Sequence, residues 1–81
     1  PCINTPRGIF VHPKTGDVLV ADFHSLVHRF DSKGNYHGII PTVLNENDQA
    51  CYMSFFFHRQ LEQVFMTFTD RDSLYILRLE Y

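Results

Sequence analysis

The sequence carries little net charge and no long apolar stretch. Its 81 residues have a formal net charge of −2, and nucleic-acid recognition normally needs a strongly basic face. The charge therefore does not favour RNA as a partner, although RNA binding stays open. No segment approaches the roughly twenty apolar residues that span a bilayer, so no membrane partner is expected. With 44% hydrophobic and 20% charged residues, the composition is that of a folded chain.

Cysteine is scarce, and targeting signals are missing. Cys2 and Cys51 are far apart in sequence and form no CxxC motif. A disulfide and two buried free thiols are both open, with the free thiols favoured. The chain starts at Pro1 and contains no secretory signal and no N-x-Ser/Thr acceptor. A processed protein, an excised fragment and an incomplete chain all stay open, and the compartment is undetermined, with the cytoplasm slightly favoured.

Motifs for catalysis and metal binding are also missing. There is no G-x-S-x-G motif, and Ser25 follows His24 directly, a spacing that does not give a nucleophile and its base. Five histidines are present, but no cluster of His, Cys and Asp has the spacing of metal ligands. The sequence therefore predicts no enzymatic activity, no cofactor and no metal site.

What the chain does contain is a series of short apolar segments separated by turn clusters. Between residues 6 and 40 these segments are residues 9–11, 18–21, 26–30 and 36–40. Runs of this length, rich in β-branched and aromatic residues, predict strands. Gly16 and Gly34 lie in the turn clusters, where glycine supplies a positive φ. The stretch therefore predicts a four-stranded β-meander, and no segment shows the apolar period and caps of a helix.

The second half of the chain repeats the first in rhythm. Residues 55–58 and 64–66 align with segments 46 residues earlier, and residues 76–79 align with a segment 49 residues earlier. We therefore divide residues 1–81 into a first unit at 6–40, a connector at 41–50 and a second unit at 51–81 that is degenerate and truncated. His12 and His58 occupy equivalent positions, which a repeated turn residue explains more simply than a metal site does.

The first two strands of each unit are apolar at consecutive positions. Such runs indicate burial on both faces of a sheet, as in a propeller blade between its neighbours. An open sandwich would show alternation in every strand. We therefore predict an all-β fold made of antiparallel meander blades of a β-propeller with an incomplete ring. The remaining blades or self-association would then cover the exposed faces.

A specific series of residue types and spacings runs through the first unit. Its members are Pro6, Gly8, Ile9, Val11, Gly16, Asp17, Val18, Val20, Ala21, Asp22, Phe30, Asp31, Gly34 and Tyr36. This series resembles the NHL-repeat β-propellers, whereas residues 51–81 match them in rhythm only. The Asn-His-(Arg/Leu) triplet of that family is reduced here to His24, Ser25 and Leu26. The resemblance implies structural turn roles for Gly8, Gly16, Asp22 and Gly34, with the Asp22 carboxylate accepting backbone N–H groups.

The resemblance also implies a function. It indicates a non-catalytic scaffold that binds a protein partner, as in the substrate-recognition part of tripartite-motif ubiquitin ligases, or RNA in some relatives. Loops on one rim would make the contacts. The candidate binding residues are Phe23, His24 and Ser25 in the first unit and Asp70, Arg71 and Asp72 in the second. No RING or B-box cysteine pattern is present, so ligase activity is not expected of this chain. The competing function is a metal-dependent six-bladed propeller enzyme of the lactonase or lyase type.

Overall fold

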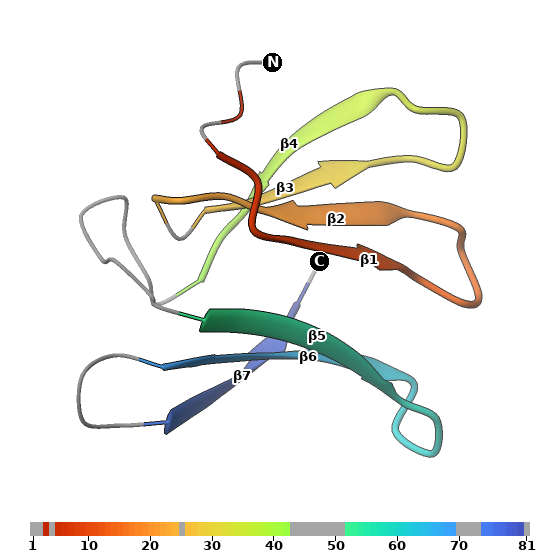
Figure 1. Ribbon diagram of the computed structural model, residues 1–81. Helices are drawn as coiled ribbons and strands as arrows, with labels where there is room; N and C mark the ends of the chain where they lie inside the picture. Colours follow the sequence, from red (N-terminus) through yellow and green to blue (C-terminus); the bar gives the residue numbers. More distant parts are fainter. Residues whose placement is uncertain (1–2, 4, 25, 43–51, 70–73, 81) are drawn as a thin grey trace.

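The described residues form two antiparallel β-sheets and no helix (Figure 1). A computed structural model describes residues 3, 5–24, 26–42, 52–69 and 74–80. The strands are β1 (Gly8–Val11), β2 (Val18–Ala21), β3 (Val27–Phe30), β4 (Tyr36–Ile40), β5 (Tyr52–His58), β6 (Gln63–Thr69) and β7 (Leu74–Leu79). One sheet has the order β1-β2-β3-β4 and the other β5-β6-β7. The predicted all-β fold with antiparallel sheets is confirmed.

Glycines at positive φ close two of the hairpins in the first sheet. Gly16, with a φ of 76°, lies in the β1–β2 turn, and Gly34, with a φ of 89°, lies in the β3–β4 turn. Gly8 differs from the expectation, because it is the first residue of β1 and pairs with Ala21 instead of lying in a turn. Among the described residues, no helix has the length and apolarity needed to cross a bilayer.

The two sheets share one pairing register at the offsets of the sequence repeat. Ile9 lies opposite Val20 in the β1–β2 pair, and Phe55 lies opposite Met66 in the β5–β6 pair. The β2–β3 and β6–β7 pairs correspond in the same way. Strands β1–β3 and β5–β7 are therefore equivalent three-stranded units, and no counterpart of β4 lies in the part of the chain that is described.

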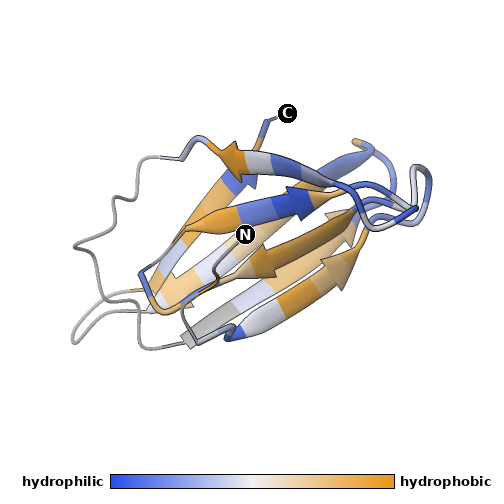
Figure 2. Ribbon diagram, turned by 90° about the horizontal axis from the view of Figure 1, so that it is seen from above, coloured by the Kyte–Doolittle hydropathy of each residue, from blue (hydrophilic) through white to orange (hydrophobic). Residues whose placement is uncertain are grey.

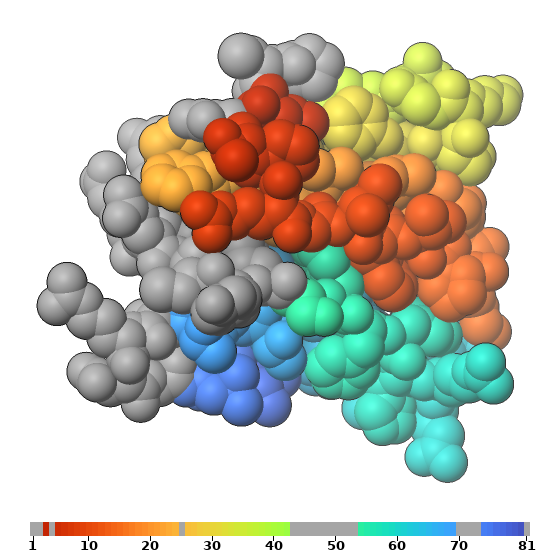
Figure 3. All heavy atoms as spheres, viewed as in Figure 1, coloured from red at the N-terminus to blue at the C-terminus, as the bar shows by residue number. Residues whose placement is uncertain are grey.

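One face of each sheet packs against the other sheet to form the hydrophobic core. The buried core residues are Leu19, Val27, Ile40, Val64, Met66 and Leu79. Strands β1 and β5 lie directly side by side (Figure 3), and the ring centroids of Phe10 and Phe55 are 5.9 Å apart across this contact. Hydrophobic residues concentrate in the strands, whereas hydrophilic residues gather in the turns at one end (Figure 2). Burial of the strand side chains against the other sheet is thus what holds the two units together.

The expectation that the first two strands of each unit are covered on both faces is wrong for the described chain. Ile9 is 71% exposed, Val11 58% and Phe56 43%. The reason is geometric, because two sheets share a single interface and each keeps one outer face. Since these strands are apolar at consecutive positions, both outer faces carry large apolar side chains.

The two sheets use opposite faces to build their interface. Leu19 is fully buried between the sheets, but its equivalent Phe65 lies on the outer face of the second sheet, where it stacks on Phe56 with centroids 5.2 Å apart. Conversely, Met66 is fully buried, and its equivalent Val20 lies on the outer face of the first sheet. The packing is therefore head-to-tail, as in an array that repeats one contact.

Candidate interaction surface

The loop predicted to bind a partner lies at one end of the molecule. The ends of β2, β4 and β6 and the starts of β3, β5 and β7 are all at this end (Figure 1). We call it the Phe23 end, after Phe23 and His24 of the β2–β3 loop. The other candidate binding residues, Ser25, Asp70, Arg71 and Asp72, lie outside the described residues.

The buried carboxylate of Asp22 holds the backbone of this loop. Its Oδ1 atom accepts hydrogen bonds from the backbone N–H of His24 at 2.9 Å and of Leu26 at 3.1 Å. Its Oδ2 atom is 2.7 Å from Nε2 of His28, which therefore donates to it, and Nδ1 of His28 is 3.0 Å from the Tyr36 hydroxyl. Asp22 and His28 are only 2% and 4% exposed. Asp22 thus ties the backbone of His24 and Leu26 to His28 of β3, and His28 in turn reaches Tyr36 of β4.

The ring of Phe23, which is half-buried, lies between two polar side chains at this loop. The guanidinium carbon of Arg7 lies 4.7 Å from the centroid of the Phe23 ring, within the range of a cation–π contact. The His24 ring meets the same ring edge-on, with centroids 5.7 Å apart. The backbone N–H of Arg7 donates to the carbonyl of Ala21 at 2.7 Å, so Arg7 is held beside β2. The result is a patch of three side chains, Arg7, Phe23 and His24, which we call the Arg7–Phe23–His24 patch.

An apolar hollow begins next to this patch, on the outer face of the first sheet. Its volume is about 510 Å³. The hollow is lined mainly by Pro6, Arg7, Gly8, Ile9, Val20 and Phe30. Because Arg7 borders both features, the Phe23 end and the outer face of β1–β4 form one continuous surface.

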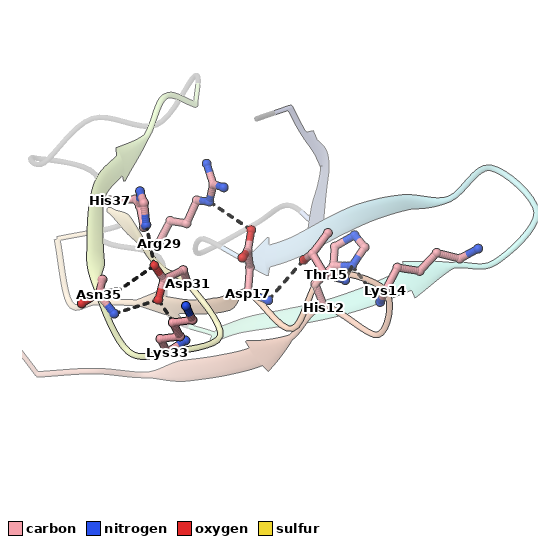
Figure 4. Close-up of polar contacts among 9 residues, drawn as sticks. All are labelled: His12, Lys14, Thr15, Asp17, Arg29, Asp31, Lys33, Asn35 and His37. Atoms are coloured by element: carbon pink, nitrogen blue, oxygen red, sulfur yellow. Dashed lines mark hydrogen bonds and ion pairs between the residues drawn. The ribbon is translucent and has the colours of Figure 1, made fainter.

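The opposite end of the molecule carries polar turns, and side-chain hydrogen bonds hold the β3–β4 turn among them (Figure 4). The Oδ1 atom of Asp31 accepts from the backbone N–H of Lys33 and of Asn35, both at 2.9 Å. Its Oδ2 atom is 2.9 Å from Nε2 of His37. The hydrogen bonds from His37 and from the Asn35 backbone hold the pKa of the Asp31 carboxyl well below its usual range. These contacts all lie within the turn and its flanking strand, so they stabilise the hairpin.

His12 and His58, at equivalent repeat positions, each accept backbone hydrogen bonds in the turn that follows them. Nδ1 of His12 accepts from the backbone N–H of Lys14 at 3.1 Å and of Thr15 at 3.3 Å (Figure 4). Nδ1 of His58 accepts from the backbone N–H of Leu61 at 3.2 Å. Each ring therefore caps the turn that follows it. Within the described residues, no group of three or more His, Cys, Asp or Glu side chains is arranged to hold a metal ion.

An ion pair joins these two turns across the interface between the sheets. Nζ of Lys14 donates to a carboxylate oxygen of Glu62, and this hydrogen bond lowers the pKa of the Glu62 carboxyl. A cavity of about 320 Å³ lies beside the pair, where it is bordered by His12 and Gln63. The Oε1 atom of Gln63 is buried and has no hydrogen-bond partner in the described part of the chain. This end thus has a polar cleft beside the Lys14–Glu62 ion pair, whereas the Phe23 end combines an aromatic ring with the Arg7 guanidinium.

Sequence reasoning missed two parts of the site. Arg7 precedes the first strand, and only the pairing of its backbone with Ala21 brings it over Phe23. His28 reaches Asp22 because β2 and β3 pair with Val20 opposite His28. The hairpin register would have revealed this pair, because it places both residues beside the short β2–β3 loop.

Comparison with known proteins identifies no relative of this chain. The chain matches no protein-family model, no curated protein and no solved structure.

Proposed function

We propose that this chain is part of an NHL-like β-propeller and acts as a non-catalytic interaction module that binds a protein partner at the Phe23 end. Two features support the propeller architecture, namely the equal pairing register of the two sheets and their head-to-tail packing. Cyclic arrays of meander blades are built from contacts of this kind. The units 6–40 and 51–81 would each be one blade.

The Arg7–Phe23–His24 patch is the observation that carries the proposed protein binding. Aromatic and arginine side chains supply most binding energy at protein interfaces, especially where they sit at a preorganised site. Here the Asp22 carboxylate fixes the loop backbone before any partner arrives. Binding would therefore cost little loop entropy. A flat aromatic ring flanked by a cation also suits a partner that offers an apolar side chain next to an acidic one.

A comparison of two variants tests this function. Phe23→Ala removes the ring at the Phe23 end, and Leu61→Ala removes an exposed apolar side chain in the turn at the opposite end. The tagged full-length protein and both variants are purified from extracts of the source cells, with and without ribonuclease, and the retained proteins are quantified by mass spectrometry. We expect a defined set of proteins to be lost at least about tenfold with Phe23→Ala and kept with Leu61→Ala.

The folded state of each variant is checked by its thermal unfolding curve. Retention of the same proteins by wild type and Phe23→Ala would overturn binding through this patch. Retention that disappears after ribonuclease would instead identify RNA as the partner.

A further inference from the structure

We propose that the outer face of the first sheet binds the outer face of β5–β7 of a second copy of this chain, head-to-tail. This inference goes beyond the proposed function, because it concerns the sheet faces and not the Phe23 end. It rests on the repeat itself. Each of the two faces that meet inside the molecule has an equivalent face on the other sheet. Both of these equivalent faces lie on the outside of the molecule and are exposed.

The aromatic contact between β1 and β5 shows which residues would meet. Phe10 of the first sheet touches Phe55 of the second, with ring centroids 5.9 Å apart. The equivalent of Phe10 is Phe56, and the equivalent of Phe55 is Ile9, as the shared register shows. Both equivalents are large, apolar and exposed, at 43% for Phe56 and 71% for Ile9. Repeating the internal contact between two copies therefore places Phe56 of one against Ile9 of the other.

A second internal contact also indicates that the two outer faces would meet in this register. The ring of His12 meets the ring of Phe57 edge-on, with centroids 5.0 Å apart. The equivalent pair is His58 on the outer face of the second sheet and Val11, exposed on the outer face of the first. In the register of the internal contact, Phe56 and His58 of one copy would thus lie against Ile9 and Val11 of the other.

The shape and chemistry of the two outer faces suit each other. On the first sheet, Ile9, Val20 and Phe30 border the hollow of about 510 Å³, so this face is concave and apolar. On the second sheet, Phe56 and Phe65 form a stacked aromatic pair that stands on the outer face. Burying an aromatic side chain in an apolar hollow removes apolar surface from water, which favours association. These five positions are uncharged, but Arg7 lines the same hollow and Arg78 pairs opposite Phe65, so two charged side chains border the apolar contact.

The contact between copies should be weaker than the one inside the chain. The internal interface carries the ion pair of Lys14 and Glu62, whose equivalent positions are Gln60 and Gly16. The contact between copies therefore lacks this pair, although an exposed pair contributes little. The larger difference is that two separate copies lose translational and rotational freedom when they associate, so self-association should depend on concentration. Because the contact is heterologous, each copy keeps one free face, so association is not limited to dimers.

Two single substitutions and their mixture test the proposal. Ile9→Glu spoils the outer face of the first sheet, and Phe56→Glu spoils that of the second. Both positions are exposed, so neither change places a charge in the core. Sedimentation velocity of the 81-residue chain over a concentration series measures the mass of wild type, of each variant and of their equimolar mixture. Far-UV circular dichroism checks that each variant keeps its sheets.

The expected results follow from the head-to-tail geometry. Wild type should form oligomers whose mass rises with concentration beyond that of a dimer. Each variant alone should associate at least about tenfold more weakly, because its only possible contact buries the new carboxylate. The mixture should form a one-to-one dimer that grows no further, since the intact Phe56 face of the Ile9→Glu copy can dock on the intact Ile9 face of the other copy.

Two outcomes would overturn the inference. One is a wild-type chain that stays monomeric at every concentration. The other is a dimer that survives Phe56→Glu but not Ile9→Glu, which would indicate a symmetric contact between two first sheets. Phe23→Ala should leave self-association unchanged, so failure of the proposed partner binding and failure of this inference can be told apart.

Discussion

Gly16 and Glu62 occupy the same position of equivalent turns, and both have left-handed backbone, with φ of 76° and 54°. The β1–β2 and β5–β6 turns therefore share a conformation as well as a place in the repeat. Glycine adopts such a φ without steric cost, whereas a side chain costs roughly 1–2 kcal/mol there. The first unit thus has the favourable residue in this turn, and the second unit carries local strain.

Replacing Gly16 by alanine should destabilise the fold more than replacing Gly34. Both glycines have a positive φ, so each alanine should cost about 1 kcal/mol for its backbone. At Gly16 the new Cβ would also lie 3.0 Å from Cβ of Ser32, whereas at Gly34 nothing lies within 4 Å. We expect a loss of about 2 kcal/mol or more for Gly16→Ala, measured by urea unfolding. Equal losses would show that the contact with Ser32 relaxes freely.

Replacing Glu62 by glycine should stabilise the chain. The change relieves the left-handed strain at this position, which should raise the free energy of unfolding by about 0.5–1 kcal/mol after the greater flexibility of the unfolded chain is counted. It also removes the exposed ion pair with Lys14, which contributes little. Glu62→Gln is the control, because it removes the charge and keeps the strain. A stabilisation as large in Glu62→Gln would contradict the explanation from strain.

Removing the Asp22 carboxylate should be among the most damaging single changes. Asp22→Ala leaves His28 and two backbone N–H groups of the loop without their acceptor. Leaving buried polar groups unpaired in this way should cost about 3 kcal/mol or more. Tyr36→Phe is the matched control, because it removes only the hydroxyl beside His28 and should cost about 1 kcal/mol. Thermal unfolding of both variants separates the contribution of the Asp22 carboxylate from that of the Tyr36 hydroxyl. A smaller loss of stability for Asp22→Ala than for Tyr36→Phe would contradict this order.

Acid should weaken the fold through Asp31. The pKa of this carboxyl is lowered in the folded state, chiefly by the hydrogen bond from His37 and then by the Asn35 backbone. A lowered pKa gives a stabilisation that is complete above the unfolded pKa of about 3.9 and is lost as the pH falls below it. The difference in unfolding free energy between wild type and Asp31→Asn should therefore be largest near neutral pH and shrink below about pH 4. Urea unfolding at several pH values measures it, and His37→Gln should reduce the same pH dependence. A difference that stays constant with pH would contradict the assignment.

Much of the fold follows from local patterns in the sequence. The apolar runs and the glycines at 16 and 34 predict the strands and hairpins of the first sheet, because strand length and turn chemistry are local properties. The bulge in β4 escapes such reasoning. It shifts the register between Arg29 and Phe30, and Gly38 of β4 has a φ of 96°. A single glycine within a strand does not reveal which strand it will pair with.

The candidate site was predictable only in part. The position of Phe23 and His24 in the β2–β3 loop follows from the meander. The partners of this loop do not, because Arg7 and His28 reach it through the pairing of neighbouring strands. The same holds for the exposure of Ile9, since a run of apolar residues reports a preference for burial and not the number of sheets available to cover it.

The short apolar runs, the turn residues and the repeat are properties of the sequence by itself, and they determined an all-β chain of two similar antiparallel units. Tertiary structure alone decided that opposite faces of the two units meet, that Asp22 is buried against His28, and that one apolar face of each sheet stays open. The physical reason is that strand formation depends on neighbours along the chain, whereas burial and polar pairing depend on which surfaces come together in space.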